Sequence, residues 1–174
     1  AAGRAVSAMK REAGAVAGET SLAGLTLKPG VNDFTLTVPL KNPRRWGVAS
    51  PYLYDFLLTL AGEDGEIISA AAARFGFREF RIADGRFLLN GEPLFVHGSN
   101  WVPAEAMHGE ARDRIRRGLE LFADLGCNMV RCWGGGVYED HDFFDYCDER
   151  GMLVWQDFML ACQLPPQDDD FARR

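Results

Sequence analysis

A strand, turn, helix and strand pattern over residues 128–157 constrains the fold of this chain more than any other feature. Residues 128–133 alternate in side-chain character as a strand does, and a run of glycines follows them. Residues 138–150 have the apolar spacing of a helix, and Gly151 stands where a glycine commonly terminates one. Residues 153–157 have the pattern of a second strand. Neighbouring strands joined through a helix are parallel, so this segment predicts a βαβ unit.

A second unit of the same kind precedes this one. Residues 93–97 are a short apolar run of the kind found in buried strands. Residues 110–125 carry apolar side chains at helical spacing, and Gly126 follows them. We therefore expect three parallel strands joined by two helices between residues 94 and 157.

Side-chain alternation in the strand that starts at residue 128 predicts two different faces. Val130 and Cys132 share one face and are small and apolar, which suits packing against helices. Arg131 shares the other face with Trp133. A guanidinium group that leaves water needs an opposite charge. Asp157, which ends the next strand, is the expected partner of Arg131.

The first 79 residues follow a different pattern, that of short β-strands. Residues 34–38, 52–60 and 66–77 have strand-like patterns, and turn residues separate them. Strands at this spacing suggest half or more of a β-sandwich. Residues 1–27 support no clear prediction.

A small hairpin is expected where the two patterns meet. Residues 87–93 contain the dipeptide Asn90-Gly91, a strong signal for a tight hairpin turn. We therefore place the domain boundary between residues 79 and 80. A β-sandwich, complete or incomplete, is expected over residues 1–79, and βα units over residues 80–174.

Composition excludes several classes of partner. The 174 residues are 47% hydrophobic and 25% charged, as in ordinary globular domains, and their net charge at pH 7 is -6. This charge provides no electrostatic surface for nucleic acid or for an anionic membrane. Apolar runs are too short to span a bilayer. We expect a neutral or small ligand, and the sequence predicts no particular oligomeric state.

The cysteines show neither CxxC spacing nor a paired zinc pattern. A chain of this size can build its own hydrophobic core, so we interpret them as reduced core thiols rather than as a disulfide scaffold. Reduced thiols and a pI of about 5.1 favour the cytoplasm. The residues concerned are Cys127, Cys132, Cys147 and Cys162.

Several motifs follow one another in the second half of the chain. They are Asn90-Gly91-Glu92-Pro93, Gly98-Ser99-Asn100-Trp101-Val102-Pro103-Ala104, Trp133-Gly134-Gly135-Gly136-Val137-Tyr138-Glu139 and Val154-Trp155-Gln156-Asp157-Phe158-Met159. In this order they resemble the opening of the catalytic barrel of β-mannosidases, which share a glycoside hydrolase family with β-galactosidases and β-glucuronidases. Trp46 and Tyr54 resemble the signature of the immunoglobulin-like domain that precedes the barrel in that family.

The resemblance implies a fold and an activity. The fold would be an immunoglobulin-like β-sandwich followed by the first about three βα units of an incomplete (β/α)₈ TIM barrel. The activity would be that of a retaining exo-glycosidase, which hydrolyses terminal non-reducing β-D-mannose residues in oligosaccharides. Such an enzyme would need no cofactor and no metal. Related exo-β-glycosidases acting on glucosamine, galactose or glucuronic acid, and a non-catalytic carbohydrate-binding or scaffolding module, are the alternatives.

The family's catalytic groups are not expected in this chain. By resemblance, both are glutamates on later barrel strands, and the acid/base residue follows an asparagine. The sequence contains no Asn-Glu pair. A closed barrel needs roughly 250 residues, whereas about 95 follow residue 79. We therefore interpret the chain as a fragment that contains no catalytic residue and is inactive by itself.

The remaining residues would form part of the pocket wall, because active sites of such barrels lie at the C-terminal ends of the strands. By resemblance, Trp133 would stack on the sugar, while Arg131 and Asp157 would bond hydroxyl groups or orient the glutamates. The expected substrate-binding residues are Asn100, Trp101, Arg131, Trp133, Asp157 and Phe158.

Each of these signals has a structural alternative. Arg131 and Asp157 could form a simple ion pair, and core packing is favoured for Trp101 and Trp155. The glycine run follows a strand as a phosphate-binding loop does, but it lacks the GxGxxG and GxxxxGK patterns. The histidines have no metal-ligand spacing. Neither a nucleotide nor a metal is therefore expected.

Overall fold

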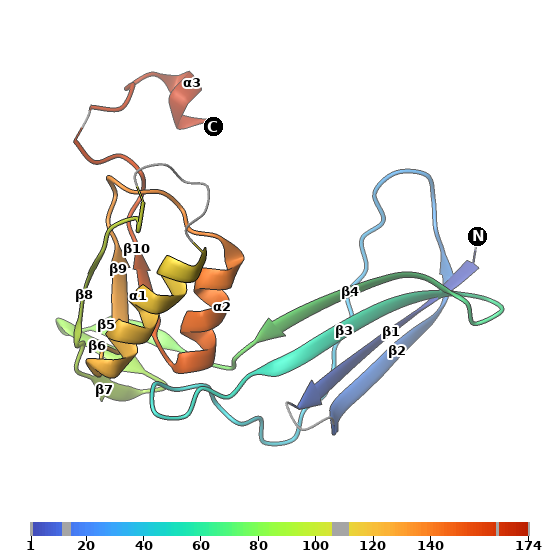
Figure 1. The fold of residues 1–174 in the computed structure, drawn as a ribbon. Coiled ribbons are helices and arrows are strands. Elements are labelled where there is room, and N and C mark those ends of the chain that lie inside the picture. The colour runs from blue at the N-terminus through green and yellow to red at the C-terminus, as the bar shows by residue number, and fades with distance from the viewer. Residues whose placement is uncertain (1, 12–14, 106–111, 163, 174) are drawn as a thin grey trace. The chain divides into compact units, whose positions relative to one another are not determined.

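The computed structural model describes residues 2–11, 15–105, 112–162 and 164–173. The chain divides into two compact units, Ala1–Glu79 and Phe80–Arg174 (Figure 1). The first unit contains strands and loops, and the second combines strands with helices. None of the helices in the described ranges is both long enough and apolar enough to cross a membrane.

The first unit is built on one antiparallel sheet with the strand order β2-β1-β3-β4. Two of its strands, β3 (Tyr54–Gly62) and β4 (Ile67–Phe75), lie where the sequence predicts strands. The other two, β1 (Ala2–Arg11) and β2 (Val16–Thr26), lie in the segment that supports no clear prediction. The described residues of this unit contain one sheet, and the second sheet of a sandwich remains a prediction.

Aromatic side chains form the core at one end of this sheet. Trp46 is fully buried, and Tyr54 is nearly so. The ring of Tyr54 contacts those of Phe75 and Phe77, and its hydroxyl accepts a hydrogen bond from the backbone N–H of Arg44 at 2.8 Å. Trp46 is therefore a core residue.

The predicted strand over residues 34–38 is wrong. This segment forms no β-ladder. Its end packs against the sheet: a Cβ placed on Gly18 of β2 would lie 3.1 Å from Val38 Cγ1 and 2.9 Å from Cδ2 of the nearby Leu40. The alternation of apolar residues is real, but it serves packing across a sheet face rather than pairing at an edge.

The second unit begins with a small antiparallel sheet in the order β5-β6-β7. Its strands are β5 (Phe80–Ala83), β6 (Arg86–Leu89) and β7 (Glu92–Leu94). The predicted turn at Asn90-Gly91 is confirmed, because both residues have positive φ angles, 57° and 90°.

The predicted strand over residues 93–97 is wrong as a member of the parallel sheet. Its first residues belong to β7, and Phe95 is 85% exposed. Asn128 holds this segment with both its side chain and its backbone. Its Nδ2 donates to the Phe95 carbonyl at 2.8 Å, its Oδ1 accepts from the His97 N–H at 2.9 Å, and its backbone N–H donates to the His97 carbonyl at 2.8 Å. The first strand of the parallel sheet is instead β8 (Gly98–Trp101).

The parallel sheet has the order β10-β9-β8, and the predicted βαβ arrangement is confirmed. β9 (Met129–Cys132) pairs with β8 on one side and with β10 (Leu153–Gln156) on the other. The crossover helices are α1 (Arg112–Asp124) and α2 (His141–Arg150). The first residues of the predicted helix over 110–125 lie outside the described ranges. Closure of the sheet into a barrel remains a prediction.

The core of this unit lies between the sheet and its two helices (Figure 1). Val130 and Cys132 are fully buried there, as alternation along β9 predicts. The Trp101 indole packs between the rings of Phe122 and Phe143. A Cβ on Gly118 would lie 2.9 Å from that indole, so the close approach accounts for a glycine inside α1.

A short helix, α3 (Asp169–Ala172), ends the described chain. The Asp168 carboxylate accepts a hydrogen bond from the Phe171 N–H at 2.8 Å and so caps its first turn.

The cysteines are all free, but they do not share one environment. Cys132 and Cys147 are buried core thiols, as predicted, and Cys127 is half-buried. The prediction is wrong for Cys162, which is exposed in a loop. Burial raises the pKa of Cys132 to about 11, with Glu139 and Asp157 adding to the shift. Burial, Cys132 and Asp148 raise the pKa of Cys147 to about 12.

The buried side of α1 can be tested with two leucines in the same helix. Leu119 is fully buried, whereas Leu121 is 58% exposed. Leu119→Ala leaves a cavity and is expected to lower the free energy of unfolding by about 3 kcal/mol. Leu121→Ala is the matched control, with an expected change within about 0.5 kcal/mol. Urea titration measures both, and equal losses would contradict the burial described for α1.

The thiol pKa values predict a loss of stability at alkaline pH. An ordinary thiol, with a pKa of 9.0, titrates in the unfolded chain, while Cys132 and Cys147 stay protonated in the folded protein. Their contribution to the free energy of unfolding is therefore complete below pH 9.0 and is lost as the pH rises towards about 12. Denaturant titrations across this pH range measure how far the free energy of unfolding falls. The fall should be smaller for Cys147→Ala, which lacks one buried thiol, than for Cys162→Ser, which keeps both. Identical pH profiles for the two variants would contradict the assignment.

Candidate functional site

A row of three side chains crosses the parallel sheet on the face opposite the helices. Asn100 of β8 and Trp155 of β10 are both in register with Arg131 of β9. This row follows from the crossover connections, since parallel strands in register place equivalent positions side by side. The sequence predicted Asn100 and Arg131 as site residues, and the structure brings them together.

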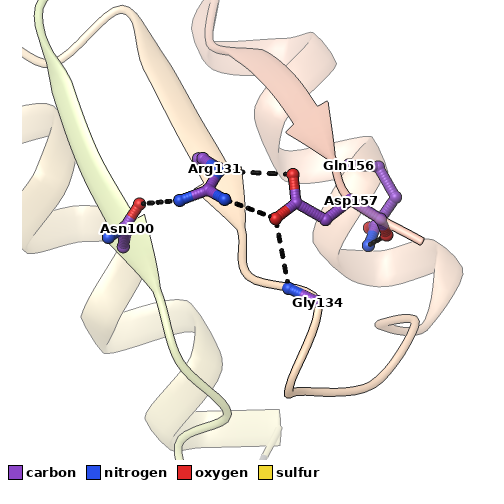
Figure 2. A network of polar contacts seen from close by, with 5 residues as sticks. All are labelled: Asn100, Arg131, Gly134, Gln156 and Asp157. Carbon is purple, nitrogen blue, oxygen red and sulfur yellow. Dashed lines mark hydrogen bonds and ion pairs between the residues drawn. The ribbon is translucent and has the colours of Figure 1, made fainter. Parts of the chain in front are cut away.

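Arg131 and Asp157 form the predicted pair (Figure 2). Arg131 Nε donates to Asp157 Oδ1 at 3.2 Å, and Nη2 donates to Oδ2 at 2.6 Å. Two parallel hydrogen bonds fix both groups in one plane and are stronger than a single contact between charges. The side chains remain 42% and 21% exposed, so the pair can still be reached from outside.

The pair is the centre of a longer polar network (Figure 2). Arg131 Nη1 donates to Asn100 Oδ1 at 3.1 Å, and the Gly134 N–H donates to Asp157 Oδ2 at 3.3 Å. Arginine only donates hydrogen bonds, so the Asn100 oxygen faces it and the Asn100 amide nitrogen is left to donate elsewhere. The network joins β8, β9 and the segments that follow β9 and β10.

Gln156 lies beside this network but on the other side of Asp157 (Figure 2). Its Nε2 donates to the Asp157 carbonyl at 2.9 Å. Its Oε1 is buried and accepts no hydrogen bond from any residue that the structure describes.

An open cavity of about 210 Å³ lies over the same face of the sheet. Its presence corrects the expectation that Trp155 packs in the core: this side chain is 48% exposed and meets the Phe87 ring edge-on, with 6.2 Å between the ring centroids. The alternation that places Trp155 on the same face as Asp157 was the available signal. The cavity is lined by Val96, Gly98, Ser99, Asn100, Met129, Arg131 and Trp155.

Trp101 is separated from the other predicted site residues. It follows Asn100 directly in β8, so its side chain points to the helix-facing side, where it is 6% exposed. The structure therefore favours core packing over contact with a ligand for Trp101. Its Nε1 donates to Glu139 Oε1 at 2.7 Å, and sequence reasoning did not anticipate this bond.

Trp133 and Phe158 lie beyond the ends of β9 and β10. Trp133 is half-buried, and Phe158 is 79% exposed. Both belong to the segments that the network holds at the C-terminal edge of the sheet, where the site is expected. Among the residues that the structure describes, no cluster of three His, Cys, Asp or Glu side chains could hold a metal ion.

Known proteins similar to this chain indicate its family. The model of "Glycosyl hydrolases family 2" matches residues 5–78. The β-mannosidase of Capra hircus is 46% identical over 86 residues, which cover 49% of this chain and 10% of that protein. β-Mannosidase B of Aspergillus fumigatus is 36% identical over 138 residues, which cover 72% of this chain and 16% of that protein.

A solved structure extends the similarity to nearly the whole chain. The crystal structure of β-D-mannosidase from Dictyoglomus thermophilum matches with a TM-score of 0.86 and 33% identity, covering 98% of this chain and 22% of that one. The resemblance to β-mannosidase-type glycosyl hydrolases of family 2 is confirmed. The chain spans less than a quarter of each of these relatives, so it corresponds to a segment of a family 2 enzyme.

The strength of the central pair in this family 2 segment can be measured by a double-mutant cycle. Arg131→Gln and Asp157→Asn should show a coupling energy of about 1 to 2 kcal/mol in unfolding experiments, because each substitution leaves a charge without its bidentate partner.

The control is the pair Arg116 and Glu120 on the surface of α1. These side chains are 69% and 47% exposed and make one contact of 3.2 Å. The cycle of Arg116→Gln with Glu120→Gln should give at most about 0.5 kcal/mol. Coupling at Arg131 no larger than at Arg116 would contradict the description of the site.

Proposed function

We propose that this chain forms one wall of the sugar-binding site in a retaining exo-glycosidase, which removes terminal non-reducing β-D-mannose residues from oligosaccharides. The observation that carries the proposal is the polar network of Asn100, Arg131 and Asp157 at one edge of a parallel sheet. The three relatives described above that share this segment are named β-mannosidases. Barrels of this class bind substrates at the C-terminal ends of their strands.

The charges at the site suit a neutral sugar. The positive charge of Arg131 is matched by Asp157, so the pair offers hydrogen bonds without a net charge. The Asn100 amide nitrogen can donate to a hydroxyl oxygen, because Arg131 occupies the Asn100 oxygen. Trp133 would supply a flat apolar surface for a sugar face. A hexose with several hydroxyl groups and no charge matches this combination.

The hydrolytic step needs groups that we place elsewhere in the complete enzyme. A retaining glycosidase uses two carboxyl groups about 5 Å apart, one as nucleophile and one as general acid and then base. The family resemblance puts both on later barrel strands, and the printed sequence has no Asn-Glu pair. In this proposal the described residues bind and orient the sugar, and Arg131 with Asp157 also positions the catalytic glutamates.

The test compares the product of the complete reading frame with the 174-residue chain. Both are assayed on aryl glycosides of β-mannose, β-glucosamine, β-galactose and β-glucuronic acid. We expect the complete product to hydrolyse the β-mannoside selectively and the 174-residue chain to match an empty-vector control. Asn100→Ala in the complete product should lower kcat/KM about tenfold, which corresponds to one lost hydrogen bond.

Each other outcome points to a different function. Preference for another glycoside would retain the enzyme class and replace the substrate. A complete product that is inactive on all of these glycosides would favour a carbohydrate-binding or scaffolding role. Hydrolysis of the β-mannoside by the 174-residue chain would show that the catalytic groups lie within it.

A further inference from the structure

The loop between β9 and α2 contains three consecutive glycines, and its backbone is crowded on two sides. A Cβ at Gly134 would lie 2.6 Å from the Phe158 carbonyl oxygen. A Cβ at Gly136 would lie 3.0 Å from Cδ of Pro103. Neither glycine has a positive φ angle, so the space available, not the backbone conformation, requires them.

Gly135 is crowded by a different kind of neighbour. A Cβ at this position would overlap the six-membered ring of the Trp133 indole. Gly135 also lacks a positive φ angle, so its φ angle does not require a glycine. The missing side chain therefore makes room for one particular aromatic ring, and that ring lies directly on the loop backbone.

Hydrogen bonds hold the loop backbone on both sides of Gly135. The Gly134 N–H donates to Asp157 Oδ2 at 3.3 Å (Figure 2), and the Gly134 carbonyl accepts from the Ala161 N–H at 3.3 Å. The Gly136 N–H donates to the Trp133 carbonyl at 3.0 Å. At the far end of the loop, Glu139 accepts the bond from the buried Trp101. Since these bonds oppose a shift of the backbone, we expect a side chain at position 135 to displace the Trp133 ring.

We propose that Gly135 is a positioning residue that sets the direction of the Trp133 indole in the sugar-binding site. This inference rests on the proposed function, in which Trp133 stacks on the terminal sugar. Stacking needs a defined ring plane and distance, and a shift of about 1 Å at such a contact can reduce the rate about a hundredfold. Gly135 acts through Trp133 alone and makes no contact with the sugar.

The first measurement is kcat/KM of the complete enzyme on an aryl β-mannoside. Gly135→Ala should lower it by between about tenfold and a hundredfold. Gly47→Ala is the matched control, because Gly47 has no positive φ angle and, apart from its two chain neighbours, no described residue has an atom within 4 Å of the added methyl group. The kcat/KM of this control variant should stay within about twofold of that of the unchanged enzyme.

The second measurement asks whether the effect passes through the Trp133 ring. Adding Gly135→Ala to a Trp133→Ala enzyme should cause no further loss of kcat/KM, because the crowded ring is gone. Adding it to Trp133→Phe should give a more active enzyme than Gly135→Ala alone, since the phenyl ring is shorter than the indole. A general defect in the loop would not be relieved by either change at residue 133.

The outcomes separate this inference from the proposed function. An active mannosidase in which Gly135→Ala has no effect, or has the same effect without the Trp133 ring, would overturn the role of Gly135 and leave the function intact. A complete enzyme that is inactive on every glycoside would overturn both. If Gly135→Ala fails to fold, the pair with Trp133→Phe decides: failure of that variant as well would mean that the methyl group meets something other than the indole.

Discussion

The positive charge of Arg131 is the constraint on which the open face of the parallel sheet depends. A guanidinium group on a strand loses part of its water, and a carboxylate must replace that water. Asp157 does so with both oxygens, while one of these oxygens also accepts the N–H of Gly134. Asn100 accepts a further hydrogen bond from Arg131 and so connects the third strand, β8, to this pair. Neutralising one charge thus draws the ends of neighbouring strands and their loops into a single arrangement.

The two faces of the parallel strands differ in environment: one is covered by helices, and the other borders a cavity. On one face, Val130 and Cys132 are sealed beneath the helices, and burial raises the pKa of the thiol. On the other face, Arg131 borders an open cavity. Since successive side chains alternate, the residues that pack beneath the helices and those that line the cavity are immediate neighbours in the sequence.

Much of this arrangement could be predicted from local patterns. Alternation and the turn glycines predicted two of the three parallel strands, both crossover helices and the pair of Arg131 with Asp157. Alternation also bears on Trp101: as the residue after Asn100, it faces the opposite side of the strand. The resemblance to a family motif grouped the two together, because a motif records which residues recur and carries no information about the direction of each side chain.

Two errors arise where a pattern has two physical causes. An apolar run at residues 93–97 suits a buried strand, but its first residues pair with β6, and Asn128 bonds to the backbone of Phe95 and His97. Alternation at residues 34–38 is compatible both with an edge strand and with a segment that lies across the face of a sheet. Both outcomes depend on partners distant in the sequence, which a local pattern does not contain.

The hydrogen bond between Trp101 and Glu139 gives the site a dependence on residues that never approach it. The donor is packed among the helices, and the acceptor ends the loop that carries Trp133. Any substitution in α1 or α2 that shifts this indole also shifts the end of the loop. During evolution, the selectivity of such an enzyme can therefore drift through changes in its hydrophobic interior, and proteins with identical binding residues can differ in the ligands they prefer.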